Sequence, residues 1–407
     1  MREMKDSGVA WIGSVPSDYR TASIGSLFTI KKDIIGQEPE TVLSITQTGI
    51  RPKDLSSNEG QNASSYAHYQ IVNVGDFAMN HMDLLTGWID ISKYEGVTSP
   101  DYRVFTLNDK EMSADYFLRV FQYYYTNKVF FGFGQGVATL GRWRLPAINF
   151  KKIDVPVPPI LEQQRIVAVI DENIGKVDAL IANVQAQIEK LKAYKQSVIT
   201  EVVTKGLDPA VPMKDSGVEW IGEIPETWTT IRVKQLLKER KERSVDGSEE
   251  PLSMSQKVGL VPTKMLDMIP NMASSFVGAK LTYVDDLVFN KLKAHLGVFS
   301  VSKYDGLVSP DYAVYYSTGK VHLKYLEYLF KTPQCISEFR KRSTGIAAGL
   351  TRLYTDGLFA IECPFPTMEE QIAIVDYLNE KCVQIDQLIA IKQKKIDKLN
   401  EYKRFTF

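Results

Sequence analysis

The sequence predicts an α+β fold in which two tandem α/β domains are separated by two long antiparallel coiled-coil helices, with an internal pseudo-two-fold repeat. Three observations lead to this prediction. Blocks of sequence recur at a period near 209 residues, each copy contains a stretch rich in aromatic and β-branched residues, and each copy then continues into a long segment with the periodicity of a coiled-coil seam.

The repeat is carried by three blocks that keep one order. The paired blocks are 4–20 with 213–229 (ten identities in seventeen positions), 91–105 with 301–315 (nine in fifteen), and 158–167 with 366–375. Solenoid repeats have periods shorter by roughly five- to tenfold. The blocks therefore indicate one duplicated unit.

Each copy begins with a globular part. Residues 1–158 (domain 1) and 207–365 (domain 2) are rich in strand-forming residues and in turn signals such as Asn73-Val74-Gly75-Asp76. A proline cluster ends each part, at Pro156-Val157-Pro158-Pro159 and at Pro364-Phe365-Pro366. We therefore expect long helices over 159–206 and 366–407, the second shorter than the first.

Both predicted helices carry apolar residues at alternating steps of four and three, the 3.5-residue period of a coiled-coil seam. The predicted seam of the first helix is Ile170, Ile174, Val177, Ile181, Val184, Ile188, Leu191 and Val198, with Lys195 in phase. The predicted seam of the second is Leu378, Ile385, Ile389, Ile396 and Leu399, with Cys382, Lys392 and Lys403 in phase. A helix of this length cannot bury its seam on one domain, so each is expected to bury the other's. Gly206 is expected at the C-cap of the first helix.

Composition excludes several classes of protein. The 407 residues carry 49 basic and 49 acidic side chains, so the net charge is zero and the chain is not basic all over. No apolar run is long enough to span a membrane, the N-terminus is too polar for a signal peptide, and the cysteines lack C-x-x-C spacing. A cytoplasmic protein without a metal site is expected.

Catalytic motifs are also missing. Phe130-Phe131-Gly132-Phe133-Gly134 resembles the glycine loop of methyltransferases, but no motif that would hold a target amine accompanies it. Pro100-Asp101 and Pro310-Asp311 lack the partner residues of a nuclease site and are expected to form turns before strands. No phosphate-binding G-x-x-x-x-G-K-[S/T] loop occurs. The sequence therefore favours a binding protein.

The candidate binding residues lie in two tips per domain, where the copies diverge or gather glycine and arginine. Glycine, small polar residues and arginine without acids suit a loop that approaches a phosphate backbone and reaches base edges. In domain 1 the candidates are Asn80, His81, Gln135, Thr139, Arg142 and Arg144. In domain 2 they are Lys291, Lys293, His295, Arg340, Lys341, Arg342, Thr351 and Arg352.

At these residues the chain resembles the specificity subunits of type I restriction-modification systems. The resemblance rests on the helix entry from Pro156 to Ile166, its less regular counterpart from Pro364 to Ile372, and the junction Lys205-Gly206-Leu207-Asp208-Pro209 followed by the repeated block from Met213 to Gly222. It implies that domains 1 and 2 are target-recognition domains, each of which reads one half of a bipartite double-stranded DNA target. The helices would set the spacing between the half-sites.

The resemblance also implies partners. Two modification subunits would dock on the helices, and restriction/translocase subunits would join the complex. S-adenosylmethionine, ATP and Mg²⁺ would belong to those partners, so this chain would be a non-catalytic subunit without a cofactor of its own. Two other readings stay open: a coiled-coil adaptor that binds only proteins, and a stand-alone DNA methyltransferase or nuclease. DNA affinity of the assembled complex tests the first, and activity of the isolated chain tests the second.

Overall fold

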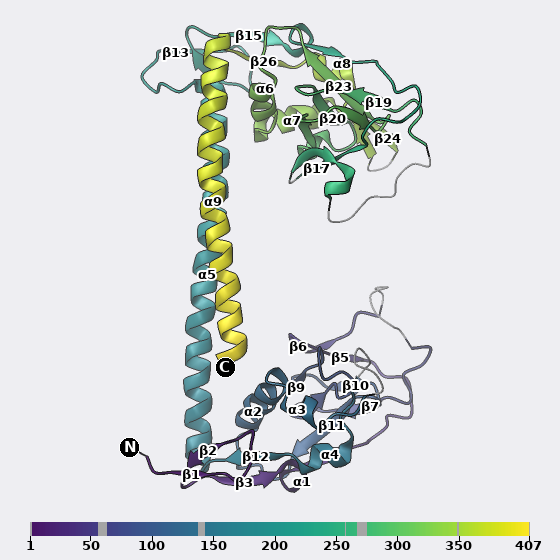
Figure 1. Ribbon diagram of the computed structural model, residues 1–407, viewed down its shortest axis with the longest axis vertical. Helices are drawn as coiled ribbons and strands as arrows, with labels where there is room; N and C mark the ends of the chain where they lie inside the picture. The colour runs from purple at the N-terminus through teal and green to yellow at the C-terminus, as the bar shows by residue number, and fades with distance from the viewer. Residues whose placement is uncertain are drawn as a thin grey trace. The chain divides into compact units, whose positions relative to one another are not determined.

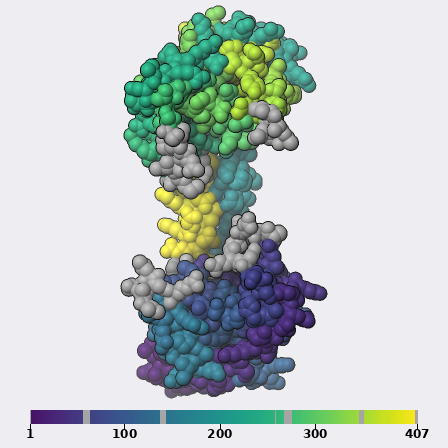
Figure 2. All heavy atoms as spheres, turned by 90° about the vertical axis from the view of Figure 1, so that its right-hand side faces the viewer, coloured from purple at the N-terminus to yellow at the C-terminus, as the bar shows by residue number. Residues whose placement is uncertain are grey.

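The computed structural model describes residues 2–55, 63–136, 143–256, 258–266, 275–347 and 350–406. It divides into two units: Met1–Val184 with Lys394–Phe407 (unit 1), and Gln185–Gln393 (unit 2). Domain 1 lies in unit 1 and domain 2 in unit 2, and the space-filling view shows the residues of each gathered in a body of its own (Figure 2).

The centre of domain 1 is a four-stranded antiparallel sheet in the order β4 (Phe28–Lys31), β11 (Arg103–Leu107), β8 (Phe77–Met79) and β9 (Ile89–Ile91). Alternate residues of these strands face opposite sides, as strand geometry requires. Phe77 and Phe105 pack with helix α2 (Ala114–Thr126) in the main core, whereas Ala78 and Val104 pack in a smaller core on the other face.

Strand pairs and short helices complete domain 1. The pairs are β1 (Met4–Asp6) with β2 (Ser14–Pro16), β3 (Arg20–Ser23) with β12 (Asp154–Val157), β5 (Leu43–Thr46) with β6 (Gly49–Pro52), and β7 (Gln70–Val72) with β10 (Gly96–Thr98). The short helices are α1 (Ile24–Leu27), α3 (Val129–Gly132) and α4 (Ala147–Lys152).

Domain 2 repeats this arrangement. Its four-stranded sheet has the order β16 (Leu237–Glu239), β23 (Tyr312–Ser317), β20 (Leu287–Asn290) and β21 (Phe299–Val301). The pairs are β13 (Met213–Asp215) with β14 (Glu223–Pro225), β15 (Thr229–Arg232) with β26 (Glu362–Phe365), β17 (Leu252–Ser255) with β18 (Gly259–Pro262), β19 (Lys280–Thr282) with β22 (Gly306–Val308), and β24 (Thr344–Ala347) with β25 (Leu350–Arg352). Its helices are η1 (Val233–Gln235), η2 (Thr263–Met265), η3 (Ala294–Leu296), α6 (Leu323–Phe330), α7 (Pro333–Arg342) and α8 (Thr355–Phe359). The predicted internal repeat is confirmed.

Two long helices follow the domains: α5 (Ile160–Lys205) and α9 (Met368–Thr406) (Figure 1). A buried glutamine fixes the start of each. Gln163 donates to Pro158 O at 2.9 Å and accepts from Ser113 N at 2.9 Å, while Gln371 donates to Pro366 O at 3.0 Å and accepts from His322 N at 2.8 Å. The proline-flanked E-Q motif therefore ties each helix to its own domain.

The end of α5 is the predicted glycine cap. Gly206 has φ +81°, a left-handed conformation that favours glycine, and its amide donates to Val202 O at 3.0 Å.

The helices are antiparallel, as predicted. In unit 2, Gln187 accepts from Lys392 and Lys195 donates to Asp386, so rising positions on α5 meet falling positions on α9. The predicted seam residues are all buried or partly buried. Val184, Ile188, Leu378, Ile385 and Ile396 are among the buried ones.

Candidate nucleic-acid interface

In each domain, a hairpin lies next to the end of a central strand, β8 in domain 1 and β20 in domain 2. That strand leads into the first predicted tip. In domain 2, β24 pairs with β25 so that Thr344 lies opposite Arg352. In domain 1, Gln135 lies opposite Arg144, joined by two backbone hydrogen bonds of 2.8 and 2.9 Å. Gln135 and Arg144 are both exposed. The residues after the hairpin occupy equivalent places in the two copies.

One backbone hydrogen bond, present in both copies, joins the two predicted tips. Leu145 N donates to His81 O at 2.9 Å in domain 1, and Leu353 N donates to Lys291 O at 3.1 Å in domain 2. The structure therefore brings His81 together with Arg144, and Lys291 with Arg352, although each pair is separated by about sixty residues of sequence. The backbone frame is kept while the side chains differ.

Asn80 and Asn290 have a structural part in this frame. The side-chain oxygen of Asn80 accepts from Met82 N at 3.2 Å, and that of Asn290 accepts from Leu292 N at 3.2 Å. Each asparagine thus closes a turn at the end of the strand, which is what asparagine side chains commonly do. One acceptor position of each side-chain oxygen is therefore used within the domain.

A buried arginine and a buried histidine lie at the base of the hairpin of domain 1. Arg103, 4% exposed, donates through Nη2 to Leu145 O at 2.7 Å, and its guanidinium lies 4.7 Å from the centre of the Phe150 ring. His81 is 7% exposed. Among the described residues, neither Nη1 of Arg103 nor Nδ1 of His81 has a hydrogen-bond partner.

The pKa values of His81 and Arg103 are both lowered in this environment. Burial first, then the charges of Arg103 and Arg144, lower the pKa of His81 to about 3. Burial and then Arg144 lower the pKa of Arg103 to about 10. Among the described residues, no carboxylate opposes either shift. Near neutral pH, His81 is therefore uncharged, and the positive charge at the base of the hairpin is that of Arg103 and Arg144, which favours the approach of an anion.

Domain 2 has a different set of side chains on the same frame. Ala313 stands on β23 where Arg103 stands on β11, and Arg352 makes an ion pair with Asp311, with 3.3 Å between Nη2 and Oδ1. Lys291, Thr351 and His295 are partly exposed and Lys293 is exposed. The surface of domain 2 is thus basic but more compensated at the hairpin than that of domain 1.

The segment from Arg340 to Arg342 was expected to belong to a loop, and that expectation was wrong. These residues form the last turn of α7, whose N-cap Thr332 accepts from Cys335 N and whose first residue is Pro333. Lys341 and Arg342 both pair with Glu338, at 2.7 and 3.5 Å. Basic residues in a last turn stabilise the helix end, so only the hairpin from Thr344 onward corresponds to the predicted tip.

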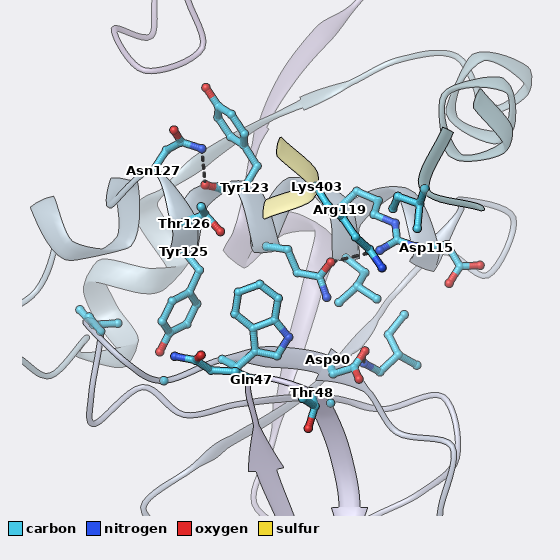
Figure 3. A pocket seen from close by; sticks show the side chains of 18 of the residues that line it. Gln47, Thr48, Asp90, Asp115, Arg119, Tyr123, Tyr125, Thr126, Asn127 and Lys403 are labelled. Atoms are coloured by element: carbon cyan, nitrogen blue, oxygen red, sulfur yellow. Dashed lines mark hydrogen bonds between the residues drawn. The ribbon is translucent and has the colours of Figure 1, made fainter. Parts of the chain in front are cut away.

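A cleft of about 700 Å³ in unit 1 was not predicted from the sequence (Figure 3). It is lined by Gln47 and Thr48 of the β5–β6 turn, by α2, and by Lys403. Two of its four cations are paired, Arg119 with Asp171 at 2.8 Å and Lys403 with Asp178 at 2.7 Å, and the carboxylates of Asp90 and Asp115 line the cleft together with Lys93 and Lys128. The cleft therefore lacks the net positive charge that a phosphate site needs.

Thr139 and Arg142 lie outside the described residues, and the other candidate DNA-binding residues stay predictions. Across the described ranges, no group of three or more His, Cys, Asp or Glu side chains is placed to hold a metal ion. No described helix is both long and apolar enough to cross a membrane.

Comparison with known proteins assigns the family. Residues 16–190 match the family described as "Type I restriction modification DNA specificity domain". This part of the chain belongs to that domain family. A similar protein is the type I restriction enzyme MjaVIII specificity subunit of Methanocaldococcus jannaschii, 24% identical over 273 residues, which is 63% of this chain and 60% of that protein. The aligned part of the chain thus spans less than two thirds of this relative.

The fold of the chain also matches a solved one. A chain from a structure described as "Structural basis underlying complex assembly and conformational transition of the type I R-M system" superposes with a TM-score of 0.63, at 14% identity and over 96% of both chains. At that identity the likeness concerns the fold, and it covers both domains and both long helices of the chain. The predicted fold class is confirmed.

Proposed function

We propose that the chain is the DNA sequence-specificity subunit of a type I restriction-modification complex, and that each domain reads one half of a bipartite duplex target. The observation that carries the proposal is the hairpin that both domains hold against the end of a central strand, through the Leu145–His81 and Leu353–Lys291 backbone bonds. Two readers of different sequences need one scaffold with different side chains, and this is the pattern found.

The charges around the hairpins support DNA as the ligand. Arg144 is exposed, and the buried Arg103 near it has no partner at Nη1 among the described residues, so a phosphate or a base edge that approaches Arg144 meets a positive potential. Arginine can bind the O6 and N7 atoms of guanine with two hydrogen bonds. Arg352, partly neutralised by Asp311, presents a different donor arrangement, which suits a different half-site.

The partners and their cofactors are part of the same proposal. Two modification subunits would dock on α5 and α9, and restriction/translocase subunits would join them. Methyl transfer with S-adenosylmethionine, and cleavage with ATP and Mg²⁺, would be carried out by those partners. Because its target would be DNA, the complex would act in the cytoplasm.

Single substitutions in the assembled complex test the proposal. The full chain is assembled with the modification subunit of its own system, and bound duplexes are selected from a random library and sequenced. Arg144→Ala should relax one half-site and Arg352→Ala the other, each at a cost of about 1 to 3 kcal/mol if a base contact is lost. Arg20→Ala, which removes an exposed arginine on β3, is the matched control and should change neither. If both hairpin variants select the parental sequence with parental affinity, the hairpins do not read DNA.

A further inference from the structure

A turn beside the first tip is built in the same way in both domains. In domain 1 the β5–β6 turn connects Thr46 to Gly49, which lie opposite each other, and in domain 2 the β17–β18 turn connects Ser255 to Gly259. The flanking strands pack in the smaller core of each domain through buried residues at matching positions. These residues are Leu43 and Ile50 in domain 1, and Leu252 and Leu260 in domain 2.

A glutamine in each turn is bound to the first tip. Gln47 Nε2 donates to Thr86 O at 3.1 Å, and Gln256 Nε2 donates to the equivalent Leu296 O at 3.0 Å. The hairpin binds the beginning of the same tip in both domains, through the backbone bonds described above. The first tip is therefore held between the hairpin on one side and the turn on the other.

A glycine after the glutamine lets each turn lie close to the central sheet. Gly49 and Gly259 have φ of +107° and +76°, a region that favours glycine. A Cβ added to Gly49 would lie 2.6 Å from Asp90 Oδ2 on β9, and one added to Gly259 would lie 2.7 Å from Ser300 Oγ on β21. The position of the turn is thus fixed by equivalent contacts in the two copies.

The apex of the turn differs, although the glutamine and the glycine on either side of it are kept. Domain 1 has Thr48 there, whereas domain 2 has Lys257-Val258. This one-residue insertion accounts for the change in the repeat shift from 209 residues before the apex to 210 after it. Thr48 is exposed, Val258 is 62% exposed, and Lys257 lies outside the described residues. The turn therefore has the same pattern as the hairpin, a constant frame with different exposed side chains.

Thr48 presents an uncharged hydrogen-bond acceptor. Thr46 Oγ1 donates to Gly49 O at 2.9 Å and lies 2.9 Å from Thr48 Oγ1, so the proton of this second contact comes from Thr48. The remaining lone pairs of Thr48 Oγ1 can accept a bond from a ligand. A phosphate has only acceptor oxygens, whereas adenine N6 and cytosine N4 present amino donors in the major groove. The chemistry of the apex therefore suits a base edge.

We propose that the β5–β6 turn is a third reading element of domain 1, in which Thr48 Oγ1 accepts from the amino group of an adenine or a cytosine in the half-site that the hairpin reads. This proposal rests on the proposed function. In domain 2, Val258 presents methyl groups at the equivalent apex, and these suit the C5-methyl of thymine. The two turns would thus add different preferences to the two half-sites.

The test uses the assembled complex and the duplex selection described above. Thr48→Val keeps the shape of the side chain and removes its oxygen, so the preference for adenine or cytosine at one position of one half-site should fall by roughly three- to tenfold. Thr48→Ser keeps the oxygen and should keep the preference. Replacing Thr48 by the dipeptide Lys-Val, the apex of domain 2, should abolish it. All three variants should leave the other half-site unchanged.

Thr29→Val is the matched control. Thr29 is an exposed threonine of the same domain on β4, the opposite edge of the sheet from β9, and its hydroxyl donates to Asn108 Oδ1 at 2.7 Å. This variant should select the parental sequence. Parental selection by Thr48→Val and by the dipeptide variant would overturn the proposal, and so would an equal loss in Thr29→Val. Arg144→Ala in the same assay then decides whether the proposed function fails with it.

Discussion

Lys195 on α5 donates to both carboxylate oxygens of Asp386 on α9, at 2.8 and 2.7 Å. A shift of 208 residues turns this pair into Lys403 and Asp178, which make the reciprocal ion pair at 2.7 and 2.8 Å. Lysines thus stand at in-phase positions of both seams and reach acids on the opposite helix. The internal repeat of the sequence therefore appears in the helix pair as two equivalent polar contacts.

We expect these lysines to determine the register of the helix pair more than they contribute to its stability. Lys195 and Lys403 are 28% and 35% exposed and their partners more so, and exposed ion pairs contribute about 0 to 1 kcal/mol. Leucine at positions 195, 392 and 403 together should raise the thermal unfolding midpoint but allow other registers or oligomers, because polar seam residues specify pairing at a cost in stability. Light scattering after size-exclusion chromatography measures the oligomeric state. Lys190→Leu, an exposed position off the seam, should leave it unchanged.

The apolar seam residues should carry the stability of the helix pair. Ile188 is 2% exposed, so Ile188→Ala should lower the free energy of unfolding by about 2 to 4 kcal/mol in urea titrations, through lost burial and the cavity left behind. Leu180, 47% exposed on the same helix, is the control, and Leu180→Ala should change stability by less than about 0.5 kcal/mol. Equal losses in the two variants would show that the seam is not the buried surface.

The length of the helices should set the spacer of the DNA target. Gln187 and Lys392 lie at one level of the helix pair, so one heptad inserted after each keeps the seam in phase. Seven residues rise by about 10 Å, which corresponds to roughly three base pairs of added spacer with unchanged half-sites. Inserting four residues instead turns the seam residues beyond the insertion away from the partner helix, and this should impair folding and assembly. An unchanged spacer in the heptad variant, read from methylated sites, contradicts the ruler role.

His81 should make stability depend on pH. Its pKa is about 3 in the folded chain and 6.5 as the ordinary value, so between these values the unfolded chain binds more protons. Stability should therefore fall as pH falls below 6.5, by up to about 2 kcal/mol at pH 5 from this residue. Urea titrations at pH 7 and pH 5 should show a smaller difference for His81→Gln than for the parent. Identical pH dependence in the two proteins would mean that His81 can be protonated in the folded state.

The long helices could be predicted because their signal is local. Alternating steps of four and three from Ile170 onward specify both the helix and its buried face, and glycine at 206 specifies its end. The helix that includes Arg340 was missed although Thr332-Pro333 is a recognisable start signal, because the run of basic residues was interpreted as a loop.

The cluster beneath the hairpin could not be predicted in the same way. Arg103 lies on β11 and His81 just after β8, two strands that pair through non-local contacts, and Leu145, which is hydrogen-bonded to both residues, lies a further forty residues along the chain. No periodicity in the sequence specifies which strands pair, or that Arg103 is buried while Arg144 is exposed. Those facts follow from packing, and they decide where the positive charge is concentrated.

Mapping N6-methyladenine in genomic DNA tests the central claim most directly. A strain that carries the modification subunit is compared with and without this chain, and then with a chain in which domain 2 is replaced by that of a relative with another target. The account predicts a bipartite methylated motif that requires the chain, and a replacement that changes one half-site and leaves the other half-site intact. A motif that persists without the chain, or that keeps both halves after the replacement, would contradict it.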